Sequence, residues 1–152
     1  MEVVSYEVDR WGVGELWLDG DRLVYHELPE ARAPTGKRPR HPLAERVCAY
    51  FAGAKDEFSD VELDLDWCTP FQRAVAEALR GVAYGETVTY GELAALAGYP
   101  NAQRAAGTFC AGNRFPLILP CHRVVAAGGL GSYGSLGLDY KRRLLALERV
   151  SL

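Results

Sequence analysis

The chain has 152 residues, of which 49% are apolar and 24% are charged, and its net charge is −3. These proportions are ordinary for a globular protein with a buried core, and they exclude collagen-like and intrinsically disordered chains. The sequence lacks an apolar run of about 18 residues, which argues against a membrane-spanning helix. The mixed, charged beginning MEVVSYEVDR is unlike a signal peptide. We therefore expect an intracellular, cytoplasmic protein.

The charge is distributed unevenly along the chain. Residues 1–68 hold 8 Lys or Arg and 15 Asp or Glu, a net charge of −7, whereas residues 69–152 hold 9 and 5, a net charge of +4. A basic C-terminal half is a mild indication of a polyanionic partner such as nucleic acid. A solvated basic face explains the same numbers.

The first half has the pattern of a small α/β domain, residues 1–68. VVSYEV, GELWLDG and RLVYHEL predict three strands, the last two joined by the turn residues 19–21. Residues 30–42 are rich in proline and basic side chains and predict an exposed loop. PLAERVCAYFAG has helical spacing, and VELDLDW at 61–67 alternates strictly between apolar and acidic residues, which predicts a strand.

The second half, residues 69–152, carries clearer helix signals. Thr69, Pro70 and Gln72 form the pattern of an N-cap, a first-turn proline and a capping box, and Thr89 and Glu92 repeat the capping box. A further helix is expected to start at Pro100 and to end near Gly112-Asn113. Two short helices with a tight turn between them predict a helix-turn-helix.

The second helix of this pair has small residues in its first turns, with Arg104 as a lone long cation. Small side chains allow a helix to approach a DNA groove, where Arg104 could enter the base stack. They would equally suit packing inside the domain.

Cys121 and His122 stand side by side after an apolar run, and a Gly-rich loop and a last helix from Asp139 follow them. A thiolate is the reactive form of cysteine, and a neighbouring histidine favours it. However, adjacent residues on a strand point to opposite faces, so the dipeptide also fits a buried Cys beside an exposed His.

The other cysteines show no metal-site or redox spacing. No CxxC pair occurs, and free cysteine is usually a small buried apolar residue, which is our expectation for Cys48. The N-terminal part offers only His26, His41, Cys48 and Cys68 as soft ligands, without the spacing of a zinc site. We predict no zinc and no cofactor.

The order of motifs from about Thr69 to Glu148 resembles the O6-alkylguanine-DNA alkyltransferases, repair proteins that move an alkyl group from guanine O6 to their own cysteine. The resemblance rests on TPFQRAV, YGETVTYGELAALAG, RAAG, GN, PCHRVV and LLALE in the family's order. Residues 1–68 match only loosely. The resemblance implies an N-terminal RNase H-like α/β domain and a C-terminal winged-helix-like domain that contains the helix-turn-helix.

The resemblance implies catalytic roles for five residues. Cys121 would accept the alkyl group, and His122 would contact it through a water and Glu148 through its other nitrogen. The carboxylate would favour the imidazolium and thereby the thiolate. Asn113 would brace the turn before the cysteine, and Tyr90 would help to protonate the leaving guanine or orient the adjacent phosphate.

The resemblance also implies a DNA surface and a base pocket. Arg104 would replace the flipped-out base, with Gln72, Thr89, Ala105 and Gly107 on the same surface. The guanine pocket would be formed by Pro116, the backbone at Val124, and the loop residues Tyr133, Gly134 and Ser135, of which Ser135 is expected to hydrogen-bond O6.

The expected protein is therefore a monomer that repairs alkylated double-stranded DNA from the minor groove, without sequence preference, through base flipping and one irreversible transfer. The expected substrate is O6-alkylguanine, with O4-alkylthymine as an open question. Two other functions stay open at this point. One is a lesion-binding protein without transfer activity, although such proteins replace the cysteine. The other is a Cys-His hydrolase, which would turn over many times and need a third orienting residue.

Overall fold

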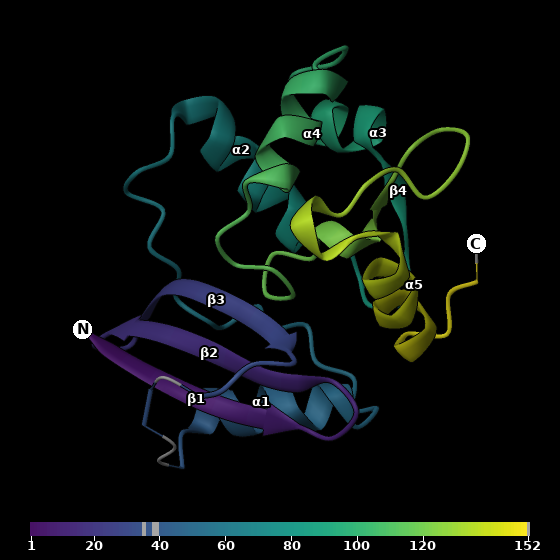
Figure 1. Ribbon diagram of the computed structural model, residues 1–152. Helices are drawn as coiled ribbons and strands as arrows, with labels where there is room; N and C mark the ends of the chain where they lie inside the picture. Colours follow the sequence, from purple (N-terminus) through teal and green to yellow (C-terminus); the bar gives the residue numbers. More distant parts are fainter. Residues whose placement is uncertain (35, 38–39, 152) are drawn as a thin grey trace. The chain divides into compact units, whose positions relative to one another are not determined.

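The computed structural model describes residues 1–34, 36–37 and 40–151. The chain forms two compact units (Figure 1). The first unit comprises Met1–Asp64 together with the short segment Arg114–Pro116, and the second comprises Leu65–Asn113 and the chain from Leu117 onwards. The domain bounds 1–68 and 69–152 stay a prediction. Among the described residues, no helix has the length and apolar character needed to cross a membrane.

The first unit is built on an antiparallel sheet of β1 (Glu2–Val8), β2 (Gly12–Asp19) and β3 (Arg22–Glu30), in that order. The three strands predicted from the sequence are therefore confirmed. Gly20 has a φ of 61° in the turn between β2 and β3, a backbone conformation that glycine adopts without steric cost.

Helix α1 (Pro42–Phe51) packs on this sheet, as the helical spacing predicted (Figure 1). The ring of His41 caps it by accepting a hydrogen bond from the Leu43 backbone N–H at 3.1 Å. Its apolar face, which includes Val47 and Tyr50, is buried. Part of the predicted loop 30–42 lies outside the described residues.

The strand predicted at 61–67 is wrong. Within the described part of the chain, this segment makes one isolated bridge, between Leu63 and Leu23, through hydrogen bonds from Leu23 N–H to Glu62 O and from Asp64 N–H to Leu23 O. Val61 and Leu63 are buried, but the chain leaves the first unit after Asp64, and further backbone hydrogen bonds of this segment, from Val61 N–H to Phe58 O and from Cys68 N–H to Leu65 O, are local turns.

The second unit is mainly helical, and its first two helices confirm the predicted capping boxes. α2 (Pro70–Arg80) begins after Thr69, whose side chain accepts from Gln72 N–H while the Gln72 side chain accepts from Thr69 N–H. α3 (Tyr90–Leu96) begins after Thr89 in the same way, with Glu92 as the reciprocal partner. The predicted α/β class, a small sheet-and-helix part followed by a helical part, is correct.

Helix α4 (Gln103–Ala111) packs against α3 to form the predicted helix pair, but it begins three residues later than Pro100. Asn101 has a φ of 70°, which lies outside the right-handed helical region, so the chain makes a further turn before the helix starts. The N-cap residue Ala102 contributes no side-chain hydrogen bond.

The remainder of the second unit surrounds the Cys-His pair. A 3₁₀ turn, η1 (Cys121–Arg123), leads into β5 (Val124–Val125), which pairs in parallel with β4 (Val88–Thr89). A second 3₁₀ turn, η2 (Gly134–Leu136), ends the Gly-rich loop before helix α5 (Leu138–Leu147). The Cys-His pair is thus on a turn rather than on an extended strand, and both side chains are buried.

Candidate active site

The thiol of Cys121 is held at the start of η1 by an asparagine. Nδ2 of Asn113 lies 2.9 Å from the backbone oxygen of Leu119 and 3.2 Å from Sγ of Cys121. One amide group therefore closes the loop between the end of α4 and the cysteine. The side chain of Cys121 is only 6% exposed, so the sulfur is fixed rather than free in solvent.

Cys121 lines a small, largely enclosed cavity in the second unit. Its walls come from α3, the end of α4, η1 and the Gly-rich loop: Tyr90, Cys110, Ala111, Cys121, Ser132, Tyr133 and Gly134. Gly131 has a φ of 81°, and a Cβ built on it would lie 3.0 Å from the Tyr90 ring. The loop therefore packs closely on Tyr90, and only glycine suits this position.

His122, Arg123 and Glu148 form a buried network beside the thiol. Nε2 of His122 lies 2.7 Å from Oε2 of Glu148, and the Arg123 guanidinium binds both oxygens of the same carboxylate, at 2.8 Å and 3.0 Å. Arg123 also donates to the backbone oxygen of Val82, and Gly85 N–H donates to Glu148. Nδ1 of His122 is buried and has no hydrogen-bond partner within the described part of the chain.

Burial keeps the imidazole of His122 and the thiol of Cys121 neutral at pH 7. Burial lowers the pKa of His122, although the hydrogen bond to the Glu148 carboxylate opposes this effect. Burial raises the pKa of the Cys121 thiol, against the opposing effects of Asn113, Lys141 and Tyr133. This differs from the imidazolium and thiolate expected from the sequence, because the burial of both groups outweighs the favourable effect of the Glu148 carboxylate on the charged ring.

Lys141 is a second buried cation near the site. Its side chain is 0% exposed, and Nζ donates to the backbone oxygens of Val124, Leu130 and Ser132 at 2.6, 2.6 and 3.1 Å. Nζ also lies 5.9 Å from the centre of the Tyr90 ring, within the range of a cation–π contact. Lys141 therefore anchors the Gly-rich loop to β5 and places a positive charge behind the cavity.

An open groove of the second unit shares residues with this cavity. It is lined by α3, α4 and the Gly-rich loop: Tyr90, Asn101, Gln103, Arg104, Gly107, Thr108, Ala111 and Ser132. Arg104 is exposed at the groove. Tyr90, Ala111 and Ser132 line both spaces, so the groove and the cavity of Cys121 are adjacent.

The structure places the residues predicted from the sequence as follows. Cys121, Tyr90, Tyr133 and Gly134 line the cavity, with Asn113 in contact with the thiol, and His122 with Glu148 behind it. Arg104 and Gly107 line the groove, whereas Thr89 and Gln72 serve as capping residues and Ala105 is exposed on α4. Three residues predicted for the base pocket do not line the cavity. Ser135 is exposed, and Pro116 belongs to the first unit. The backbone oxygen of Val124 accepts a hydrogen bond from Lys141.

Sequence reasoning missed Arg123, Lys141, Cys110 and Ser132. Arg123 stands inside an apolar stretch next to the Cys-His pair, which was a signal for a buried and paired cation. Lys141 had no such signal, because a lysine in the first turns of a polar helix is usually solvated. Among the residues that the structure describes, no group of three or more His, Cys, Asp or Glu is placed to hold a metal ion.

Comparisons with known proteins agree with this arrangement. Residues 70–150 match the family model described as 6-O-methylguanine DNA methyltransferase, DNA binding domain. The chain is 51% identical over 131 residues to a methylated-DNA–protein-cysteine methyltransferase of Mycolicibacterium paratuberculosis, an alignment that covers 84% of this chain and 78% of the relative. It is 49% identical over 106 residues to that of Mycobacterium bovis, covering 69% of this chain and 62% of the relative.

Solved structures show the same likeness. The crystal structure of Mycobacterium tuberculosis OGT in complex with DNA superposes with a TM-score of 0.81 at 37% identity and covers 98% of this chain and 93% of that chain. The methyltransferase from Pyrococcus kodakaraensis gives 0.74 at 27% identity, with 98% and 99% covered. The chain belongs to the methylated-DNA–protein-cysteine methyltransferases, the O6-methylguanine DNA methyltransferases of DNA repair.

Proposed function

We propose that this protein binds alkylated double-stranded DNA from the minor groove, as a monomer and without sequence preference, and transfers the alkyl group of O6-alkylguanine to Sγ of Cys121. The observation that carries the proposal is that Cys121 lines an enclosed cavity adjacent to the open groove at Arg104. A base stacked inside a duplex cannot enter such a cavity. The target nucleotide is therefore flipped out, at a cost of a few kcal/mol.

The chemical step is an in-line displacement at the alkyl carbon. The S–C bond forms as the C–O6 bond breaks, so the products are a thioether and guanine. The thiol proton leaves toward Nδ1 of His122 through a bridging water, and Glu148 stabilises the imidazolium that forms transiently. The released guanine takes up one proton, for which the Tyr90 hydroxyl is the proposed donor, and the imidazolium then returns the former thiol proton to the Tyr90 phenolate through solvent. No group beside the thioether can activate it for hydrolysis, so each molecule reacts once.

The neutral resting state suits this mechanism. Because burial raises the pKa of Cys121 and lowers that of His122, the thiol is protected from other electrophiles until the flipped-out base reaches it. Proton transfer then accompanies the displacement rather than preceding it. Tyr133 and Gly134 are proposed to contact the base, and Ser132 lies closer to the thiol cavity than the predicted Ser135.

Mass spectrometry of the intact protein tests the acceptor. After incubation with an O6-methylguanine duplex, the protein should carry one methyl group, localised to the peptide that contains Cys121. Cys121→Ala should remain unmodified, and Cys48→Ala, a matched change in the first unit, should react like the unchanged protein. Binding of alkylated DNA with the alkyl group left in place would identify a lesion-binding protein instead.

Arg104→Ala tests base flipping. The change should slow transfer from duplex DNA by about 10-fold or more, and it should leave reaction with free O6-benzylguanine within about 2-fold, because a free base needs no flipping. Arg104→Lys retains the charge and controls for loss of phosphate contacts. Equal losses with duplex and free base would contradict the role of Arg104.

A further inference from the structure

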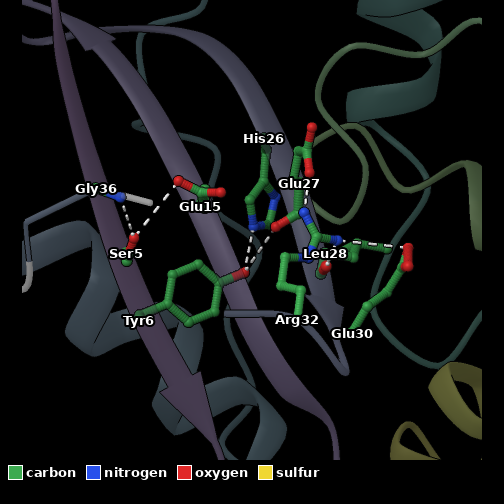
Figure 2. A network of polar contacts seen from close by, with 9 residues as sticks. All are labelled: Ser5, Tyr6, Glu15, His26, Glu27, Leu28, Glu30, Arg32 and Gly36. Carbon is green, nitrogen blue, oxygen red and sulfur yellow. Dashed lines mark hydrogen bonds and ion pairs between the residues drawn. The ribbon is translucent and has the colours of Figure 1, made fainter. Parts of the chain in front are cut away.

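A buried line of side chains crosses the sheet of the first unit and ends at the segment that precedes the active-site cysteine. Tyr6 on β1 stands opposite Gly14 on β2, and its hydroxyl lies 2.5 Å from Nε2 of His26 on β3 (Figure 2). A Cβ on residue 14 would lie 2.3 Å from the Tyr6 ring, so a glycine on the middle strand is required for the tyrosine to cross it.

His26 holds the segment Arg114–Pro116 at two points. Its backbone N–H donates to the Arg114 oxygen at 2.9 Å, and Nδ1 of its ring lies 2.7 Å from the Pro116 oxygen. Phe115, between these two carbonyls, is 0% exposed. One residue of β3 thus fixes the backbone of the segment on both sides of a buried aromatic side chain.

The proton positions in this line follow from the partners. A carbonyl oxygen only accepts, so Nδ1 of His26 carries the hydrogen and donates to Pro116. Burial lowers the pKa of His26 to about 4, so the ring is neutral at pH 7 and Nε2 is an acceptor. The Tyr6 hydroxyl is therefore the donor, and it fixes the tautomer that Pro116 needs.

The segment that His26 holds is continuous with the catalytic loop. Asn113, immediately before it, contacts both Leu119 O and Sγ of Cys121. Leu117, immediately after it, is buried with a φ of 76°. Such a backbone conformation is unfavourable for a residue other than glycine and persists only where the surroundings hold it.

We propose that His26, with Tyr6 as its tautomer-fixing partner, is a positioning residue for alkyl transfer: it holds residues 114–116 so that Asn113 keeps its contact with the Cys121 thiol. Neither residue lines the cavity of Cys121 or the groove at Arg104. The inference rests on the proposed function of Cys121, and it assigns a role in the chemistry to His26 and Tyr6, two residues that lie outside the DNA-binding family match at residues 70–150. Displacement of reacting groups by about 1 Å can cost up to 100-fold in rate, so a loosened loop is expected to be measurable.

The test compares His26→Leu, His26→Asn and Tyr6→Phe in the full chain under single-turnover conditions. His26→Leu removes the ring donor and should lower the maximal transfer rate about 10-fold with both duplex DNA and free O6-benzylguanine, with the half-saturating DNA concentration unchanged. His26→Asn keeps an N–H near the Nδ1 position and should restore most of the rate. Tyr6→Phe retains the Nδ1 donor, and its rate should fall between those of the unchanged protein and His26→Leu.

Ser5→Ala is the matched control. Ser5 is buried in the same sheet and joins Glu15 and the Gly36 N–H in a polar cluster of its own (Figure 2). Removal of the Ser5 hydroxyl should leave the transfer rate unchanged. Backbone hydrogen exchange at residues 115–121 should become faster in His26→Leu but not in Ser5→Ala. A normal rate in folded His26→Leu, or in Tyr6→Phe should His26→Leu not fold, would overturn the inference.

The two proposals fail in distinguishable ways. If the unchanged protein gains no alkyl group at Cys121, the proposed function is wrong. If the unchanged protein reacts and the His26 and Tyr6 variants react equally fast, only the positioning role is wrong. A rise in half-saturating DNA concentration without a change in maximal rate would place the effect on DNA binding and would also overturn the positioning role.

Discussion

Two histidines are buried to the same degree, one in each unit, and they differ in the groups that hold them. His26 is 1% exposed and lies between a phenol and a backbone carbonyl, whereas His122 is 0% exposed and lies against the Glu148 carboxylate. Burial lowers the pKa of both rings. Only His122 has a partner whose negative charge can stabilise a proton that arrives during a reaction.

The difference shows what makes a buried histidine suited to proton transfer. A carbonyl and a hydroxyl satisfy the neutral ring of His26 completely, so any added proton breaks a hydrogen bond. The carboxylate beside His122 instead favours the charged ring, and burial holds the resting state neutral. The partner, rather than the burial, therefore separates the positioning site from the proton-accepting site.

Removal of the carboxylate should have the largest effect. Glu148→Gln retains the shape of the side chain but removes the charge that binds His122 and Arg123, and breaking such a buried pair typically costs about 3–5 kcal/mol of unfolding free energy. Alkyl transfer in the folded fraction should also slow strongly, because the imidazolium loses its counter-charge. Chemical denaturation and single-turnover kinetics measure the two effects. A loss below about 1 kcal/mol would contradict the central place given to Glu148.

Protonation of His26 should give the next largest effect. The folded pKa of about 4 lies below the ordinary 6.5, so the unfolded chain binds the proton first as the pH falls. Stability from this group is therefore complete above pH 6.5 and is lost as the pH falls toward 4. Between pH 7 and 5 this loss amounts to roughly 2 kcal/mol.

The variant His26→Asn isolates that contribution, because it removes the titrating ring while the carboxylates and other histidines still titrate. Denaturation curves at pH 7 and pH 5, followed by tryptophan fluorescence, should show a smaller loss of stability for the variant than for the unchanged protein. Parallel losses in the two proteins would mean that His26 is more accessible to protons than its burial indicates.

Lys141 extends the comparison to a buried amino group, which is held by three backbone carbonyls. Lys141→Met should leave the oxygens of Val124, Leu130 and Ser132 without this donor and cost about 2 kcal/mol, since unsatisfied buried acceptors cost about 1–3 kcal/mol. Transfer to Cys121 should slow with duplex and free base alike, because the loop beside the thiol is released. Arg142→Met, on the exposed side of α5, is the control and should change neither.

The elements with local signals were predictable from the sequence, and those that depend on distant partners were not. The capping boxes at Thr69 and Thr89 predict the starts of their helices from patterns of four residues. In contrast, the alternation at 61–67 satisfies the strand pattern but finds only one bridge partner, Leu23. The start of α4 depends on the left-handed turn at Asn101, which Pro100 alone does not reveal.

The candidate site divides in the same way. The motif around Cys121 predicted the cysteine, the histidine and, through the family resemblance, the distant Glu148, and the structure brings His122 and Glu148 together. The roles of Arg123, Lys141 and His26 depend on burial and on backbone carbonyls from far along the chain. The apolar surroundings of Arg123 in the sequence indicate that it is buried, but the partners of all three residues can be identified only from the folded structure.

The smallest effects are expected when one tyrosine hydroxyl is removed from each unit. Tyr6→Phe removes the buried donor to His26 and should cost about 1–2 kcal/mol of unfolding free energy, because Nε2 loses a partner inside the sheet. Tyr84→Phe removes a longer, 3.2 Å bond to the Leu147 oxygen at a partly exposed site and should cost about 0.5 kcal/mol. Urea denaturation of both variants resolves the difference, and the same samples report transfer rates. If Tyr84→Phe slowed transfer more than Tyr6→Phe, the line from Tyr6 through His26 to Pro116 would have no special connection to the thiol.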